Sequence, residues 1–113
     1  MEKFGAPAYH GRVLSRRFTK ASPSDQPLFS TYKLGPMTLK NRVIMAPMTR
    51  CRSTLPGEIP NELNATYYAQ RSTASLIISE ATHINPGGRG YHAMPGIYSD
   101  AQRDGWKLVT DAV

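Results

Sequence analysis

The sequence predicts an α/β fold, because two short apolar runs are separated by a helical stretch. The first run, residues 43–45, is typical of a buried strand and stops at Pro47. The second run, residues 76–79, has the same character. Strand, helix and strand then form one βαβ unit, whose two strands we expect to be parallel neighbours. Polar residues follow both runs, and the carboxyl ends of parallel strands are where α/β proteins bind ligands.

A short hairpin is predicted before the βαβ unit. Apolar and polar residues alternate imperfectly over residues 28–34, Gly35 and Pro36 supply a turn, and residues 37–39 form the returning strand. Residues 1–26 contain glycine, proline and serine without a sustained period. We therefore expect a disordered leader there.

The helix between the two runs is predicted over residues 62–72. Asn61 follows Pro60 and is a suitable N-cap, because its side chain can accept hydrogen bonds from the first turn. The apolar stripe expected on this helix consists of Leu63, Tyr67 and Tyr68. A loop rich in glycine follows the second strand over residues 83–98.

A second helix is predicted to open at Ser99. Its spacing to Gln102 is that of a capping box, in which each side chain bonds the backbone of the other residue. Trp106, Val109 and Val113 share one helical face, which we expect to lie against the sheet. No glycine or proline stop follows, so we expect a helix that is unfinished at Val113.

Composition places limits on function. The net charge of +6 is concentrated at the start, where residues 1–24 carry five basic side chains and one acidic one. Because aromatic residues are not interleaved with these charges in a repeating way, the sequence predicts no nucleic-acid partner. No apolar run approaches the about 20 residues of a membrane span. The single cysteine, Cys51, favours a reducing, cytoplasmic location, although the basic leader weakly resembles an organelle-targeting segment. The histidines lack metal-ligand spacing, so no metal is expected.

Five short blocks carry a family resemblance. They are residues 41–50 (NRVIMAPMTR), 67–71 (YYAQR) and 76–82 (LIISEAT), the pair Gly90-Tyr91, and residues 95–97 (PGI). In this order they resemble the old yellow enzyme family of FMN-dependent ene-reductases, in the branch of N-ethylmaleimide reductases and 12-oxophytodienoate reductases. The resemblance covers about residues 27–113. It implies the N-terminal portion of a (β/α)8 TIM barrel, namely the hairpin and about two βα units. The barrel is incomplete because a whole one needs about 250 residues.

The resemblance also implies an activity. In that family FMN takes a hydride from NADPH and passes it to the C=C bond of an α,β-unsaturated carbonyl, such as an enone or the oxylipin 12-oxophytodienoate. The residues that anchor the substrate and donate the proton lie further along the family's chain. No catalytic residue is therefore assigned here, and whether this chain is itself an enzyme stays open. The alternative is a non-catalytic truncated remnant, or a basic adaptor without flavin.

Four residues are implied as the cofactor-binding set: Pro47, Met48, Thr49 and Ala81. Thr49 would donate a hydrogen bond to the flavin pyrimidine, where extra charge accumulates on reduction. Taken without the resemblance, Thr49 could equally bond a nearby backbone carbonyl. Pro47 and Met48 would otherwise be a strand stop and a core filler. Ala81 is a small residue that leaves room for the isoalloxazine, and it is equally compatible with a packed strand.

The neighbours of these residues receive structural interpretations. Glu80 is expected to form a salt bridge, or to hold in place the residues that contact the ligand. Arg50 is expected to pair with a carboxylate. Tyr67 and Tyr68 are expected to pack the helix against the sheet. Residues 72–75 lack the glycine that relatives use before the second strand, which leaves the entry to that strand undefined.

Overall fold

The computed structural model describes residues 26–113, so the predicted leader at residues 1–26 lies outside the described residues except for Gln26. The described chain begins with a 3-10 turn, η2 (Pro27–Phe29), and a second such turn, η3 (Pro86–Gly88), lies in the loop between β4 and α2. The strands and helices are β1 (Tyr32–Leu34), β2 (Met37–Leu39), β3 (Ile44–Met45), α1 (Glu62–Ala69), β4 (Leu76–Ile77) and α2 (Asp100–Ala112).

The predicted hairpin is confirmed, with a shorter first strand. β1 pairs with β2 in antiparallel register, Tyr32 opposite Leu39, and Gly35 at the turn has a φ of 55°. The strand was expected from residue 28, but Pro27 fixes the backbone for a 3-10 turn instead. The Ser30 hydroxyl closes this turn by donating to the Pro27 carbonyl at 2.7 Å.

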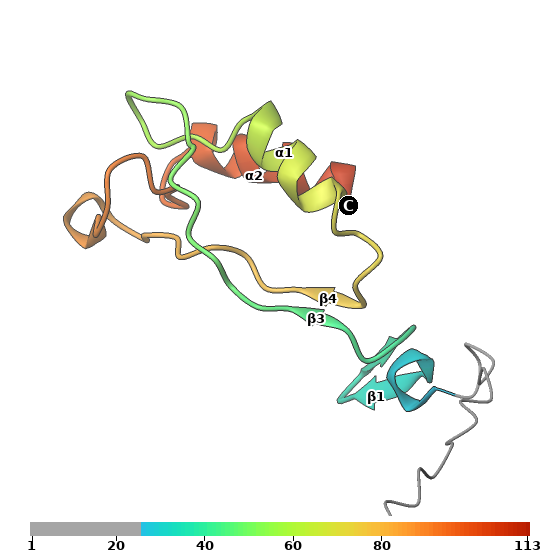
Figure 1. Ribbon diagram of the computed structural model, residues 1–113. Helices are drawn as coiled ribbons and strands as arrows, with labels where there is room; N and C mark the ends of the chain where they lie inside the picture. Colours follow the sequence, from blue (N-terminus) through green and yellow to red (C-terminus); the bar gives the residue numbers. More distant parts are fainter. Residues whose placement is uncertain (1–25) are drawn as a thin grey trace, which may run out of the picture.

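The two apolar runs form a parallel pair, as predicted. Ile44 lies opposite Leu76 and Met45 opposite Ile77, and both strands leave the same end of the sheet (Figure 1). Ladder strands of two residues are shorter than expected. Pro47 cannot donate a ladder hydrogen bond, and this ends β3 within two residues of Met45.

Hydrogen bonds from the segment before β3 define the entry to β4, where glycine is missing. The Asn41 N–H donates to the Ser75 hydroxyl at 2.7 Å, and its side-chain amide donates to the Thr73 carbonyl at 3.2 Å. The Lys40 ammonium donates to the Ser72 carbonyl at 2.9 Å. The turn before β4 is therefore held by partners about 32 residues earlier in the chain.

Helix α1 begins as predicted and ends early. The Asn61 side-chain oxygen accepts from the N–H groups of Leu63 and Asn64, and the Asn64 side chain returns a bond to the Asn61 N–H. The helix ends at Ala69, three residues before the expected end.

The expected stripe on α1 is wrong for Leu63, which is 58% exposed. The buried face instead contains Asn64, Ala65 and Tyr68. Tyr67 is half-buried beside Tyr68, with their rings 5.3 Å apart in an edge-to-face arrangement. The face is rotated because Asn64 and Tyr68, four residues apart, both bond the same buried carboxylate of Glu80.

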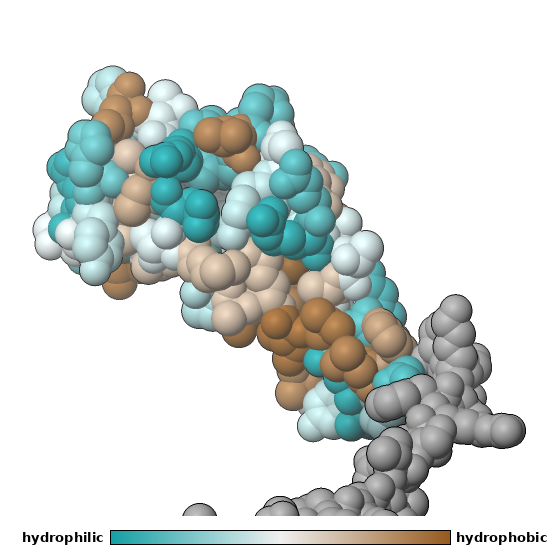
Figure 2. Space-filling model, viewed as in Figure 1, coloured by the Kyte–Doolittle hydropathy of each residue, from teal (hydrophilic) through white to brown (hydrophobic). Residues whose placement is uncertain are grey.

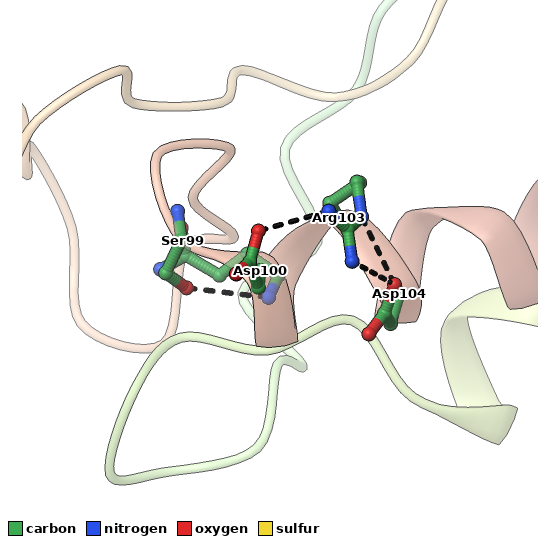
Figure 3. Close-up of polar contacts among 5 residues, drawn as sticks. Ser99, Asp100, Arg103 and Asp104 are labelled. Atoms are coloured by element: carbon green, nitrogen blue, oxygen red, sulfur yellow. Dashed lines mark hydrogen bonds and ion pairs between the residues drawn. The ribbon is translucent and has the colours of Figure 1, made fainter.

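The predicted capping box of α2 is confirmed. Ser99 Oγ accepts from the Gln102 N–H, and the Gln102 side chain accepts from the Ser99 N–H. Arg103 lies between Asp100 and Asp104 and forms ion pairs of 2.9 Å with both (Figure 3). All three side chains are exposed, so these pairs contribute little to stability.

Both helices lie on the same side of the β3–β4 pair (Figure 1). Ala65, Tyr68 and Val109 are the buried centre of the cluster, and Met45, Tyr67, Ile77 and Trp106 pack around it. Val113 was expected on this face but is 55% exposed. Gly105 brings α2 close to the chain before α1, since a Cβ there would collide with the Pro60 carbonyl oxygen.

Apolar side chains also remain on the surface. Figure 2 shows them gathered over the hairpin and the β3–β4 pair. Val43, Ile44 and Ile78 are each between 39% and 47% exposed. Within residues 26–113, neither helix has the length and apolar character required to cross a membrane.

Candidate functional site

The four residues singled out from the sequence come from two neighbouring strand ends. Pro47, Met48 and Thr49 follow β3, and Ala81 follows β4. Because β3 and β4 are parallel neighbours, both segments leave the same end of the pair (Figure 1). All four residues are exposed, and Met48 is 45% accessible.

Three donors just after β3 have no partner among residues 26–113. The Thr49 hydroxyl makes no hydrogen bond there, so the backbone-carbonyl interpretation of this residue finds no support. The N–H groups of Met48 and Thr49 likewise donate to no described residue. An exposed strand end with free donors can bind an electron-rich ligand edge.

Glu80 connects the two strand ends to helix α1. It is 2% exposed, and its Oε2 accepts from the Arg50 N–H at 2.8 Å. Its Oε1 accepts from Asn64 Nδ2 and the Tyr68 hydroxyl, both at 3.4 Å. The Glu80 N–H donates to the Tyr68 hydroxyl at 2.8 Å. Because Arg50 follows Thr49 and Glu80 precedes Ala81, this network fixes the backbone on both sides of the candidate site.

Burial raises the pKa of Tyr68 to about 12. The Glu80 N–H that bonds the phenol oxygen favours the phenolate and opposes this shift, while the negative charge of Glu80 adds to it. Tyr68 therefore stays protonated through the physiological range and acts as a hydrogen-bond bridge. Its role, and that of Asn64, was not predicted, because both lie about twelve to sixteen residues from Glu80 in sequence.

The expected ion pair of Arg50 is absent among the described residues. Its backbone N–H, and not its guanidinium, contacts Glu80. The guanidinium lies over the Tyr67 ring, with Cζ 5.1 Å from the ring centroid. Glu80 supports the site through hydrogen bonds, and the salt bridge offered as its other role does not occur within residues 26–113.

Two cavities lie near these groups. A cavity of about 470 Å³ adjoins β4 and α2, and its mostly apolar lining includes Ile77, Trp106, Val109 and Val113. A smaller cavity of about 150 Å³ adjoins the start of α1 and is lined by Arg50, Arg52, Leu63, Asn64 and Tyr67.

His83 is the buried histidine of the described chain. Its ring lies 5.3 Å from the Tyr98 ring, and neither ring nitrogen has a hydrogen-bond partner there. Across residues 26–113, no group of histidine, cysteine and carboxylate side chains converges as metal ligands would.

Comparison with known proteins identifies the class of molecule to which this site belongs. The profile of the NADH:flavin oxidoreductase / NADH oxidase family matches residues 27–113. The chain is 50% identical over 88 residues to 12-oxophytodienoate reductase 7 of Oryza sativa subsp. japonica, covering 77% of this chain and 22% of the relative. It is 46% identical over 92 residues to flavin oxidoreductase hxnT of Emericella nidulans, covering 78% and 24%.

Solved structures agree. Morphinone reductase in complex with tetrahydroNAD matches with a TM-score of 0.72 and 52% identity, over 78% of this chain and 24% of that one. The old yellow enzyme homologue from Zymomonas mobilis matches with a TM-score of 0.72 and 49% identity, over 77% and 24%. The chain belongs to the NADH:flavin oxidoreductase / NADH oxidase family, and the resemblance to old yellow enzymes is confirmed. It spans about a quarter of the length of these relatives.

Old yellow enzymes are FMN-dependent, and the described residues fit one edge of a flavin. The free Thr49 hydroxyl and the neighbouring N–H groups can donate to electron-rich ring atoms. Met48 and Pro47 offer exposed apolar surface, and Ala81 projects only a methyl group. The fit is partial, because two strand ends contact one side of such a cofactor.

Proposed function

We propose that residues 27–113 form the first part of an FMN-dependent oxidoreductase that reduces the C=C bond of α,β-unsaturated carbonyls with NADPH. The observation that carries the proposal is the pair of strand ends at Thr49 and Ala81. They are exposed, adjacent in a parallel pair, supplied with unpartnered donors, and held by the buried Glu80.

The role of each residue follows from its position. FMN, when bound, supplies hydride transfer between the nicotinamide and the unsaturated carbonyl. The Thr49 hydroxyl would donate a hydrogen bond to the ring edge that carries negative charge after reduction, and this favours the reduced cofactor. Pro47 and Met48 would exclude water from that edge. Ala81 would keep the approach from β4 open, because a larger side chain would occupy the same space.

We also propose that the segment is the opening of a (β/α)8 barrel. The hairpin, two parallel strands and two helices on one side of them are the elements that such a barrel starts with. β4 has one edge without a described strand partner, and the apolar cavity of about 470 Å³ adjoins it. A following βα unit would pair with that edge and cover the apolar lining.

The names of the relatives support the substrate class. Curated matches include 12-oxophytodienoate reductases and a chanoclavine-I aldehyde reductase, and the solved morphinone reductase was obtained with tetrahydroNAD. An α,β-unsaturated carbonyl reduced by a nicotinamide donor is the chemistry that we carry over. The basic adaptor hypothesis rests on the charges of residues 1–24, and all of these residues lie outside the described range of 26–113.

The test uses a chimera in which residues 27–113 replace the equivalent segment of morphinone reductase. We expect the purified chimera to be yellow, to release FMN on denaturation, and to oxidise NADPH or NADH when 2-cyclohexenone is added. The matched control carries Ala81→Leu, which places a larger side chain at the second strand end and should lower FMN content. A folded chimera without flavin or enone reduction would contradict the proposed function.

A further inference from the structure

Two arginines lie over the ring of Tyr67, and a third lines the cavity beside it. The Arg71 guanidinium carbon lies 3.8 Å from the ring centroid, and that of Arg50 lies 5.1 Å from it. Arg52 lines the same small cavity as Arg50 and Tyr67. The only side-chain hydrogen bonds of Arg52 and Arg71 to described residues are to the Cys51 and Tyr67 carbonyl oxygens and to the Gln70 amide oxygen.

This positive charge has no carboxylate partner among residues 26–113. The ion pairs found there are made by Arg89, Arg103 and Lys107. Glu80 is buried, and its oxygens accept from neutral donors. Glu62, in the first turn of α1, is exposed and belongs to no ion pair of the described chain. The guanidinium groups of Arg50 and Arg71 share the Tyr67 ring and repel each other, and an anion bound beside Arg50 would offset this repulsion.

The cavity of about 150 Å³ provides a place for such an anion. Two guanidinium side chains from the β3–α1 loop form one part of its lining, and Leu63, Asn64 and Tyr67 of α1 form the other. The two arginines flank Cys51, so both follow Thr49 within three residues along the chain. The cavity therefore lies beside the strand end at which the cofactor edge is proposed.

We propose that Arg50 and Arg52 form a binding site for a phosphate dianion, against the face of α1 that carries Asn64 and Tyr67. A planar guanidinium donates two parallel hydrogen bonds to neighbouring phosphate oxygens, and two such groups match the double negative charge. The phosphate can come from inorganic phosphate or from the 2′-phosphate of an NADP-type dinucleotide. The dinucleotide source rests on the proposed function, whereas the phosphate site does not.

The test is a titration of the flavin-free 113-residue chain, followed through the side-chain Nε–H resonances of Arg50 and Arg52 by NMR. Inorganic phosphate, NADP⁺ and NAD⁺ are added separately at constant ionic strength. We expect both resonances to shift with inorganic phosphate and NADP⁺. Arg50→Gln and Arg52→Gln should each weaken binding about tenfold, the usual effect of losing one charge-assisted contact.

Arg42→Gln is the matched control. Its guanidinium lies over the Tyr32 ring at 5.2 Å, close to the 5.1 Å of Arg50 over Tyr67, but it does not line the cavity. This variant loses the same charge and the same kind of ring contact. It should leave phosphate affinity unchanged.

The outcomes separate the sources and the hypotheses. Tighter binding of NADP⁺ than of inorganic phosphate and NAD⁺ identifies the dinucleotide, and equal binding of NADP⁺ and inorganic phosphate identifies the free anion; both support the site. Resonances that do not move, or an equal loss of affinity in Arg42→Gln, overturn it. The same titration of the chimera repeats the measurement in a complete barrel. A chimera that binds phosphate but reduces no enone would contradict the proposed function alone.

Discussion

Replacing Glu80 by Gln tests whether the two strand ends are held by one carboxylate. The amide has nearly the same shape, but it offers one oxygen where the carboxylate offers two. If the oxygen faces the Arg50 N–H, the new NH₂ group faces the Asn64 amide, which is also a donor. If the amide is reversed, it faces the Arg50 N–H with a donor. One contact is lost in either orientation.

The size of the effect can be worked from the distances. The Arg50 contact of 2.8 Å is the strong one, and the two 3.4 Å contacts lie near the limit for a hydrogen bond. A hydrogen bond to a charged group contributes about 1.5–3 kcal/mol. An amide oxygen turned toward Arg50 keeps this bond but without the charge, so we expect a local loss of about 1 kcal/mol, which corresponds to about fivefold faster opening of the Arg50 N–H.

The measurement is amide hydrogen exchange of Arg50 in the chimera, compared with the parent. Glu62→Gln is the matched control, because it makes the same chemical change at an exposed carboxylate outside the network. Tyr68→Phe completes a double-mutant cycle, in which we expect coupling because the Tyr68 hydroxyl donates to the Glu80 carboxylate. Unchanged Arg50 exchange in Glu80→Gln would refute the reasoning.

Four further outcomes follow from the contacts. Because burial raises the pKa of Tyr68 to about 12, the stability that this residue contributes is complete below pH 10 and falls by about 3 kcal/mol at most as the pH rises from 10 to 12; Tyr68→Phe should flatten that part of a denaturation series in the chimera. Thr49→Ala in the chimera should slow flavin reduction by NADPH about tenfold in stopped-flow traces, without changing the melting temperature. Gly105→Ala should destabilise the chimera by about 1–3 kcal/mol in thermal melts, because the new Cβ meets the Pro60 carbonyl, whereas Asp104→Ala beside it should not. The 113-residue chain alone should hold no FMN after gel filtration, and a yellow, enone-reducing preparation would refute this.

The sequence was sufficient for the order of elements and for the parallel pairing. Apolar runs ended by proline or by polar residues mark strands independently of their surroundings, and the Ser99 and Asn61 caps act over three residues. The lengths of the strands were predicted less well from the sequence. A ladder in a two-stranded sheet extends only while both chains can pair. Pro47 limits it at one end; at the other, the Asn41 N–H donates to the Ser75 hydroxyl and the Asn41 side-chain oxygen accepts from the Val43 N–H.

The sequence was sufficient to place the candidate residues at one end of a parallel strand pair, but not to show which side chains fix that end. Thr49 and Ala81 could be brought together from sequence, because parallel strands place their carboxyl ends at one edge. The contacts of Glu80 with Asn64 and Tyr68 could not, because a carboxylate after a strand is compatible with an ion pair, a ligand contact or a hydrogen-bonded support. Leu63 was wrongly predicted on the buried face of α1. The polar residue Asn64 is buried there instead, because it bonds Glu80, and the apolar periodicity of the helix does not reveal this partner.

The β3–β4 pair is held by side chains as well as by its backbone ladder. At the amino ends of the strands, Asn41 bonds Ser75 and Thr73; at the carboxyl ends, Glu80 bonds the Arg50 backbone. These contacts join residues 30 to 34 positions apart, so each fixes the relative position of the two strands without a third strand. The geometry of Thr49 and Ala81 is therefore a property of this segment, and it can be transferred with the segment into a larger barrel. Cofactor affinity is different, because an edge contact on two strand ends leaves most of a flavin exposed to solvent. The chimera separates these two properties. The geometry of Thr49 and Ala81 should come from residues 27–113, and affinity for the cofactor should appear only when the remaining strands are supplied.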